Sequence, residues 1–211
     1  TASGATGGTG ISLISGNNTW GAILFGDSDD DDIGYIKYAH NGDYMRFGTG
    51  AGIRFRIDAD GVKFNGDTAA TNALDDYEEG YHTPTIVGST SGSWTTATYT
   101  TLTYTKIGRV VHIGGYLNIS SESSPSGTMR ISLPVAVGSF THDSGNNSLS
   151  VSLRGHNGST ALYNVTAAVS EGTSYMELIA VAGTGSHTWI GDGQIDGSAN
   201  IRIGGHYFTA W

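Results

Sequence analysis

Residues 53–66 read Ile-Arg-Phe-Arg-Ile-Asp-Ala-Asp-Gly-Val-Lys-Phe-Asn-Gly, a pattern typical of β-hairpins. Apolar and basic residues alternate through Ile53–Ile57, which is the period of a strand with one apolar face. Asp60-Gly61 and Asn65-Gly66 are dipeptides that accept positive φ in tight turns. Two short strands joined by a hairpin are expected here, and similar patterns recur through the first third of the chain.

Short apolar runs alternate with turn signals from Ile11 to Phe64. The expected strands are Ile11–Ser15, Gly21–Phe25, Ile33–Tyr38, Tyr44–Phe47, Ile53–Ile57 and Val62–Phe64. All five bases of residues 1–80 fall inside these strands, whereas the acids lie mostly in turns or at strand ends. A meander this thin covers one of its faces at most. We therefore expect residues 11–67 to form a β shaft that packs against identical copies of the chain.

Composition excludes several classes of protein. The chain of 211 residues contains 33 glycines but only three prolines, three methionines and no cysteine, so long helices, a collagen repeat, disulfides and thiol catalysis are not expected. A formal net charge of −9 argues against a nucleic-acid partner. The chain has no run of 18 apolar residues, the pattern that would predict a membrane-spanning helix. An all-β protein is what remains.

Residues 81–211 carry longer strands that are rich in Thr, Val and Ile. The expected strands are Trp94–Thr105, Val110–Ile119, Met129–Leu133, Leu149–Arg154, Ala161–Val169, Ser174–Val181, Thr188–Ile190 and Ile201–Phe208. About eight strands separated by Gly/Ser/Asn loops favour an antiparallel β-sandwich head of jelly-roll type. Residues 1–10 are expected to be a glycine-rich linker, and the acidic, alanine-containing stretch 68–80 a junction between shaft and head.

For the residues that could carry metal or acid–base chemistry, a structural role is preferred. The run Asp27–Asp32 lacks the glycine and the final glutamate of an EF-hand loop, so an acidic turn is preferred to a loose cation site. Seven scattered histidines predict no metal site within one chain, although one histidine from each copy could meet on a threefold axis. The carboxylates of residues 75–79 are close together and are expected to be exposed, which favours a connector over a glycosidase pair. We expect no catalytic residue, metal or cofactor.

Three stretches together resemble the distal part of bacteriophage tail-fibre proteins. They are Phe25–Asp30 continuing through Ile33–Tyr38 to Tyr44–Phe47; Ala73–Gly80 followed by Thr83-Pro84-Thr85; and Tyr104–Ile113. The second is similar to the junction that leads into a receptor-binding tip. The resemblance implies a parallel homotrimer with an intertwined shaft, an upstream fibre region as a partner, a place in the virion tail fibre, and a tip that recognises a bacterial surface.

Glycan recognition requires aromatic faces together with polar groups for hydroxyls, and the loops of the head offer both. The candidate receptor-binding residues are Trp94, His142, Asp143, Asn146, Asn147, His156, Asn157, His187 and Trp189. Burial in the head or at a subunit interface is the alternative for both tryptophans. The function expected is host attachment through a surface glycan, without catalysis. The alternatives are a bacterial surface adhesin, a tailspike-like enzyme that degrades polysaccharide, and a purely structural fibre cap.

Overall fold

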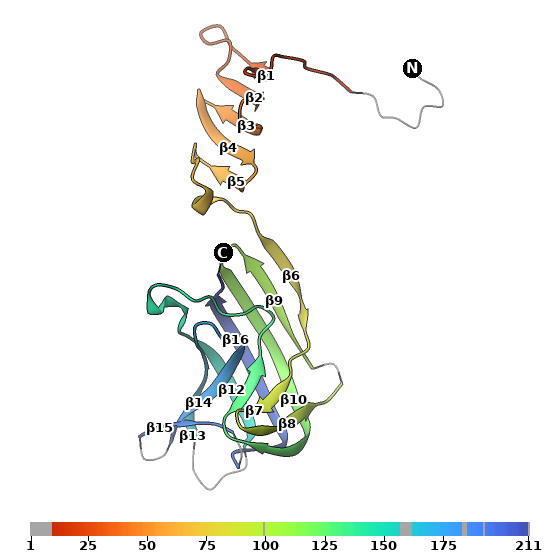
Figure 1. Cartoon of the computed structure of the whole chain (residues 1–211), viewed down its shortest axis with the longest axis vertical. Coiled ribbons are helices and arrows are strands. Elements are labelled where there is room, and N and C mark those ends of the chain that lie inside the picture. The colour runs from red at the N-terminus through yellow and green to blue at the C-terminus, as the bar shows by residue number, and fades with distance from the viewer. Residues whose placement is uncertain (1–9, 99, 157–161, 183–184, 192, 211) are drawn as a thin grey trace, which may run out of the picture. The chain divides into compact units, whose positions relative to one another are not determined.

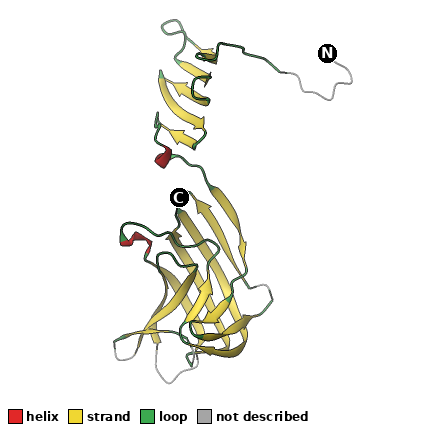
Figure 2. Ribbon diagram, viewed as in Figure 1, coloured by secondary structure: helices red, strands yellow, loops and turns green. Residues whose placement is uncertain are grey.

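The chain divides into two compact units, Thr1–Asp75 and Asp76–Trp211. The computed structural model describes residues 10–98, 100–156, 162–182, 185–191, 193–210. Strands dominate both units (Figure 2), which confirms the all-β prediction. The helical elements within the described residues are two 3₁₀ turns, η1 (Ala70–Asn72) and η2 (Asp143–Gly145). No helix among these residues has the length and apolar character needed to cross a membrane.

The N-terminal unit is a five-stranded antiparallel meander in which each strand pairs with the next along the chain (Figure 1). Its strands are β1 (Trp20–Phe25), β2 (Gly34–Ala39), β3 (Tyr44–Thr49), β4 (Gly52–Asp58) and β5 (Gly61–Phe64). Gly61 adopts a φ of 122° in the β4–β5 turn, a conformation that favours glycine. The strand predicted at Ile11–Ser15 is wrong, because these residues form no strand. The five strands pair within one chain, and intertwining with other copies stays a prediction.

The C-terminal unit is a closed antiparallel barrel of eight strands. Its elements are β6 (Tyr77–His82), β7 (Ile86–Gly88), β8 (Ser91–Thr96), β9 (Thr101–Ile107), β10 (Val110–Ser126), β11 (Met129–Ser132), β12 (Asn147–His156), β13 (Leu162–Val169), β14 (Tyr175–Ala182), β15 (His187–Trp189) and β16 (Ile195–Phe208). The barrel strands follow one another as β16-β12-β13-β14-β11-β7-β8-β10, and pairing of β10 with β16 closes the ring. The sequence predicted two sheets of a sandwich, whereas the observed sheet closes on itself.

The long strand β10 makes this closure possible. Along Val110–Asn118 it pairs with β16, and along Val110–Tyr116 it also pairs with β9. Beyond Ile119 it pairs with β8 through two register shifts. Such irregularities bend a strand and increase its twist, so β10 can belong to two parts of the curved wall. Strands β9 and β6 extend the sheet beside β10 without joining the ring.

A continuous apolar core fills the barrel. Alternate residues of β10 point inward, and Val111, Ile113 and Leu117 are buried there. They belong to one cluster with residues of β11, β14 and β16, including Met129, Leu178 and others. Tyr207 is buried as well, and its hydroxyl donates to the carbonyl of Val135 at 2.7 Å. The residues between these inward positions face the outside of the barrel, since successive side chains of a strand alternate.

Candidate functional sites

A row of four basic side chains crosses one face of the N-terminal sheet. Lys37 lies opposite Arg46, Arg46 opposite Arg56, and Arg56 opposite Lys63. Aromatic rings cover part of this row: the Lys37 ammonium lies 4.2 Å from the centroid of Tyr35, and the Arg56 guanidinium 3.9 Å from that of Tyr44. Like charges directly opposite one another repel, so the row needs counter-charges.

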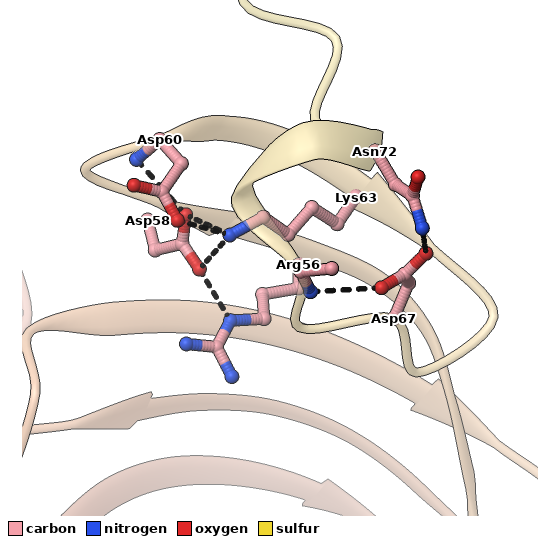
Figure 3. Close-up of polar contacts among 7 residues, drawn as sticks. Arg56, Asp58, Asp60, Lys63, Asp67 and Asn72 are labelled. Carbon is pink, nitrogen blue, oxygen red and sulfur yellow. Dashed lines mark hydrogen bonds and ion pairs between the residues drawn. The ribbon is translucent and has the colours of Figure 1, made fainter.

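Carboxylates from the strand ends supply these counter-charges. Lys63 donates to Asp58 at 2.9 Å and to Asp60 at 2.6 Å, and Arg56 donates to Asp58 at 2.6 Å (Figure 3). Lys37 pairs with Asp32 at 2.7 Å. The hydrogen bond from Lys63, followed by that from Arg56, holds the pKa of Asp58 below its ordinary value. The hydrogen bonds to Asp60 and then Asp58 raise the pKa of Lys63. Three of the four bases in the row thus have carboxylate partners, whereas Nε of Arg46 is buried without a hydrogen-bond partner among the described residues.

The opposite face of this sheet carries a ladder of apolar side chains. Ile23, Ile36, Phe47, Phe55 and Phe64 lie directly opposite one another across β1 to β5. The rings of Phe47 and Phe55 meet edge to face at 5.5 Å, and those of Phe55 and Phe64 at 5.7 Å. None of the five is buried, and Phe64 is 52% exposed, whereas Lys63 beside it is 1% exposed. We call these five residues the apolar ladder. A large apolar surface of this kind is typical of an interaction face.

The acidic loop between β1 and β2 is a self-capped turn. A side-chain oxygen of Asp27 accepts hydrogen bonds from the backbone N–H groups of Asp29 and Asp30, which lowers the pKa of Asp27. A side-chain oxygen of Asp30 likewise accepts a hydrogen bond from the backbone N–H of Asp32. Carboxylate oxygens of Asp30, Asp31 and Asp32 lie within 4.8 Å of one another, but Asp32 is already paired with Lys37. The residues form a hydrogen-bonded turn, and the preference for a turn over a cation site stays a prediction.

Four of the candidate receptor-binding residues lie together in the loop that contains η2. Glu171 organises this loop, because its carboxylate accepts from the backbone N–H of Gly145 at 2.9 Å. The side-chain oxygen of Asn146 accepts from the N–H of Glu171, and the amide of Asn147 donates to the carbonyl of Ser144. His142 and Asp143 are exposed. The two asparagines therefore hold the loop, and the other two side chains face solvent.

Three further candidates lie away from that loop. His187 and Trp189 belong to β15, which pairs with β14, and Figures 1 and 2 show β15 and η2 at opposite ends of the barrel. Trp189 is 49% exposed. His156 ends β12 and is exposed. Asn157 falls outside the described residues. The structure thus separates the candidates into two groups and does not form one site from them.

Trp94 is removed from the candidate surface by its burial. Its side chain is 3% exposed and belongs to the core cluster of the barrel. The indole N–H donates to the carbonyl of Ile195 at 3.4 Å. Because Trp94 points inward on β8, its ring faces are covered by protein and are not available to a sugar. The alternative of burial, given for Trp94 in the sequence analysis, is the one observed.

A cross-strand row of small and polar residues runs over the outside of the barrel. Its members lie opposite one another on β6, β9, β10, β16, β12 and β13 in that order: Tyr81, Thr103, Gly114, Gly204, Ser150 and Thr166. Neighbouring residues such as Leu102 and Ile113 are buried, so this row faces outward. Five inter-strand spacings give it a length of about 24 Å. We call it the outer-wall row.

Larger side chains border the outer-wall row on both sides. On one side His112 lies opposite His206, with their ring centroids 5.6 Å apart. On the other side Tyr116 lies opposite Arg202, whose guanidinium is 5.3 Å from the tyrosine centroid. The hydroxyl of Tyr116 donates to the side chain of Asn200.

Shallow grooves occur along this row. One of about 460 Å³ lies over β6 and β9 and is lined by Glu79, Tyr81 and Thr103 among others. A second, of about 340 Å³, lies over β12 and β16 beside Ser152, Arg202 and Gly204. A third, of about 540 Å³, continues onto β13 beside Asn164. Polar side chains and backbone therefore line an extended, open surface.

The comparisons with known proteins give one structural similarity. No protein-family model and no curated protein matches the sequence. The fold is similar to part of a tailspike. The crystal structure of the Dettilon tailspike protein (gp208) matches with a TM-score of 0.52 over 66% of this chain, at 18% sequence identity. This chain spans 25% of the length of that tailspike.

The tailspike similarity corrects two expectations. The resemblance to a tail fibre holds only at the coarser level of a fold shared with part of a phage protein, and that structural neighbour is a tailspike. The expectation that the chain is not an enzyme is overturned by the same neighbour. A tailspike-like enzyme was one of the alternatives to the function expected from the sequence. At 18% identity the likeness shows the fold, and no activity is transferred with it.

The sequence analysis did not identify the outer-wall row or its borders. Their residues come from six strands, and only the register of those strands brings them together. One signal was present: Gly114-Gly115 interrupts an apolar strand, where glycine often marks a bulge or a close backbone approach. The paired glycine, Gly204, lies 90 positions further along the chain, and pattern within a single strand does not reveal that pairing.

Proposed function

We propose that this chain is the receptor-binding end of a phage tail fibre or tailspike, that it works as a homotrimer, and that it attaches the virion to a bacterial surface glycan. The observation that carries the proposal is the apolar ladder. A soluble chain that buries lysine and exposes phenylalanine on the same sheet requires a partner for the apolar face. Other copies of the chain are the simplest partner, because each brings an identical ladder.

The fold supports the attachment role independently of the ladder. The similarity of the fold to part of a tailspike supports this role, and the polar outer wall and exposed loops offer groups that suit sugar hydroxyls. A trimer would also present three copies of each site, and multivalent attachment strengthens weak single contacts greatly. A bacterial adhesin and a structural cap are the competing functions.

Two measurements test the proposal on the full chain. Light scattering after size-exclusion chromatography is expected to give a mass about three times 21.9 kDa, and a stable monomer would contradict the assembly. Fluorescently labelled protein is then applied to a panel of bacterial strains. Decoration of particular strains, reduced by the polysaccharide extracted from those strains, is the expected result. Decoration of no strain would favour the structural cap.

The same polysaccharide allows catalysis to be measured directly. Incubation with the protein, followed by an assay for new reducing ends and for loss of viscosity, distinguishes a binding protein from a polysaccharide-degrading one. The control is protein unfolded by heat before incubation. Turnover would make the chain a tailspike-like enzyme, and the attachment role would remain because such an enzyme also binds its polymer.

A further inference from the structure

The outer wall of the barrel has the form needed for an extended polymer. The outer-wall row crosses six strands, with one groove over β6 and β9 at one end and two grooves that share Ser150 at the other end. Tyr81 stands at one end of the row, and the other bulky side chains stand beside it. A ligand lying across the strands would therefore meet a bordered channel of about 24 Å, much longer than a single sugar ring.

The chemistry of the borders suits a carbohydrate. Tyr81, at one end of the row, is 80% exposed, and an exposed aromatic face is suited to the apolar side of a sugar ring. Ser150, Ser152 and Thr166 present hydroxyl groups along the other end, and His112 and His206 add ring nitrogens on one border. These are donors and acceptors of the kind that hydroxyl groups require.

The charged side chains beside the row further restrict the class of ligand. Arg202 has no carboxylate partner among the described side chains, and neither has Arg154, two residues beyond Ser152 on β12. By contrast, Lys106 is paired with Asp76 and Arg130 with Glu177 in the same unit. Two guanidinium groups without a carboxylate partner among the described side chains favour a ligand that brings carboxylates.

We infer that the outer-wall row, bordered by the His112–His206 pair and by Tyr116 with Arg202, is the binding site for an acidic bacterial polysaccharide that lies across the strands. This inference rests on the proposed function and names the site and the ligand class for it. Arg202 and Arg154 bind carboxylates of the polymer, Tyr81 stacks on a sugar, and the bare backbone at Gly114 and Gly204 lets the chain lie close to the sheet.

Gly204 provides a test that leaves the fold intact. A Cβ atom at Gly204 would meet no neighbour within 4 Å, and the residue does not have a positive φ. Gly204→Gln is therefore expected to fold and to fill the middle of the channel. Thr95→Gln is the matched control, because Thr95 is an exposed residue of β8 and is not part of the row. Arg202→Gln tests the charge.

The ligand is the surface polysaccharide extracted from a decorated strain, used as isolated and after chemical reduction of its carboxyl groups to alcohols. Binding to immobilised full-length protein is measured by biolayer interferometry. We expect Gly204→Gln to lose about tenfold or more in affinity, Arg202→Gln a similar amount, and Thr95→Gln nothing. The reduced polymer is expected to bind the wild-type chain about tenfold more weakly than the native polymer, and Arg202→Gln is expected to lose most of its preference for the native form.

The outcomes separate this inference from the proposed function. If the wild type decorates bacteria and Gly204→Gln binds equally well, the site is elsewhere and attachment stands. Equal binding of native and reduced polymer overturns the acidic ligand. If Gly204→Gln changes the molecular mass of the assembly, the wall is a contact between copies and not a glycan site. If the wild type decorates no strain and binds no extracted polymer, the proposed function fails as well.

Discussion

The ammonium of Lys63 lies 2.9 Å from a carboxylate oxygen of Asp58 across the β4–β5 hairpin, and the lysine side chain is fully buried. Charged residues are seldom buried this completely unless they are paired. Around this pair the usual order is reversed, because Lys37 and Lys63 are buried while Ile23 and Phe64, at the two ends of the apolar ladder, are exposed. Stability and assembly of the N-terminal sheet should therefore respond to different substitutions.

The acid side of the stability curve should depend on Asp58. Its pKa is lowered in the folded chain, from an ordinary value of 3.8, chiefly by the hydrogen bond from Lys63. A lowered folded pKa stabilises the protein above the unfolded pKa, and this stabilisation is lost as the pH falls through 3.8 toward the folded value. We expect the melting temperature of the N-terminal sheet to fall in this range. Circular dichroism melts between pH 5 and pH 2 measure it, and Asp58→Asn should show a flatter dependence below pH 3.8. An unchanged profile would contradict the assignment.

Assembly should depend on the apolar ladder. Phe47→Glu places a charge at the centre of the ladder, where a second copy would have to desolvate it, so we expect the trimer to dissociate. The mass from light scattering would fall toward 21.9 kDa. Asn41→Glu, at an exposed position in the turn between β2 and β3, is the control and should leave the mass unchanged. A trimer that survives Phe47→Glu would show that the ladder is not the contact.

Trp94 should be a stability residue. Replacement of a buried tryptophan by alanine costs about 3–5 kcal/mol, so Trp94→Ala is expected to lower the denaturation midpoint strongly. Trp94→Phe should retain most of the stability. The phenylalanine variant should also decorate bacteria as the wild type does, because the ring is inside the barrel. If a well-folded Trp94→Phe variant lost decoration of bacteria, Trp94 would belong to the binding surface after all.

His82 should give the barrel a mild dependence on pH near neutrality. Burial lowers the pKa of His82 from its ordinary value of 6.5, and its Nε2 lies 2.9 Å from the hydroxyl of Ser132. Because the folded state then binds protons less readily than the unfolded state, stability decreases as the pH falls below 6.5. Urea midpoints measured at pH 7.5 and 5.5 should differ for the wild type, whereas in His82→Gln the difference should shrink.

Much of the local structure follows from the sequence, because periodicity and turn chemistry act over a few residues. Asp60-Gly61 marks a hairpin, and the alternation in Ile53–Ile57 places Arg56 and Phe55 on opposite faces, as observed. Ile11–Ser15 failed as a strand because apolar content without a pairing partner does not produce one. The stretch Trp94–Thr105 is divided between two strands, because β8 ends at Thr96 and β9 begins at Thr101.

Long-range pairing accounts for what the sequence did not predict. Closure of the barrel requires Val110 to meet Phe208 and Ile131 to meet Ile86, and alternation within each strand is the same in a sandwich and in a barrel. The polar surroundings of Trp94 suggested an exposed loop, although the residue belongs to a strand with one inward face. The outer-wall row was likewise hidden, because its six members are ordinary residues until the register aligns them.

The basic row on the N-terminal sheet also affects the order of folding and assembly. A shift of pairing by one residue would move Lys63 to the other face and away from Asp58. The ion pair between these residues therefore favours the correct strand register within a single chain. The hairpins can then adopt their final pairing before neighbours arrive. In the proposed trimer, assembly would then be the docking of preformed sheets, and its rate should rise with protein concentration while the rate of hairpin formation does not.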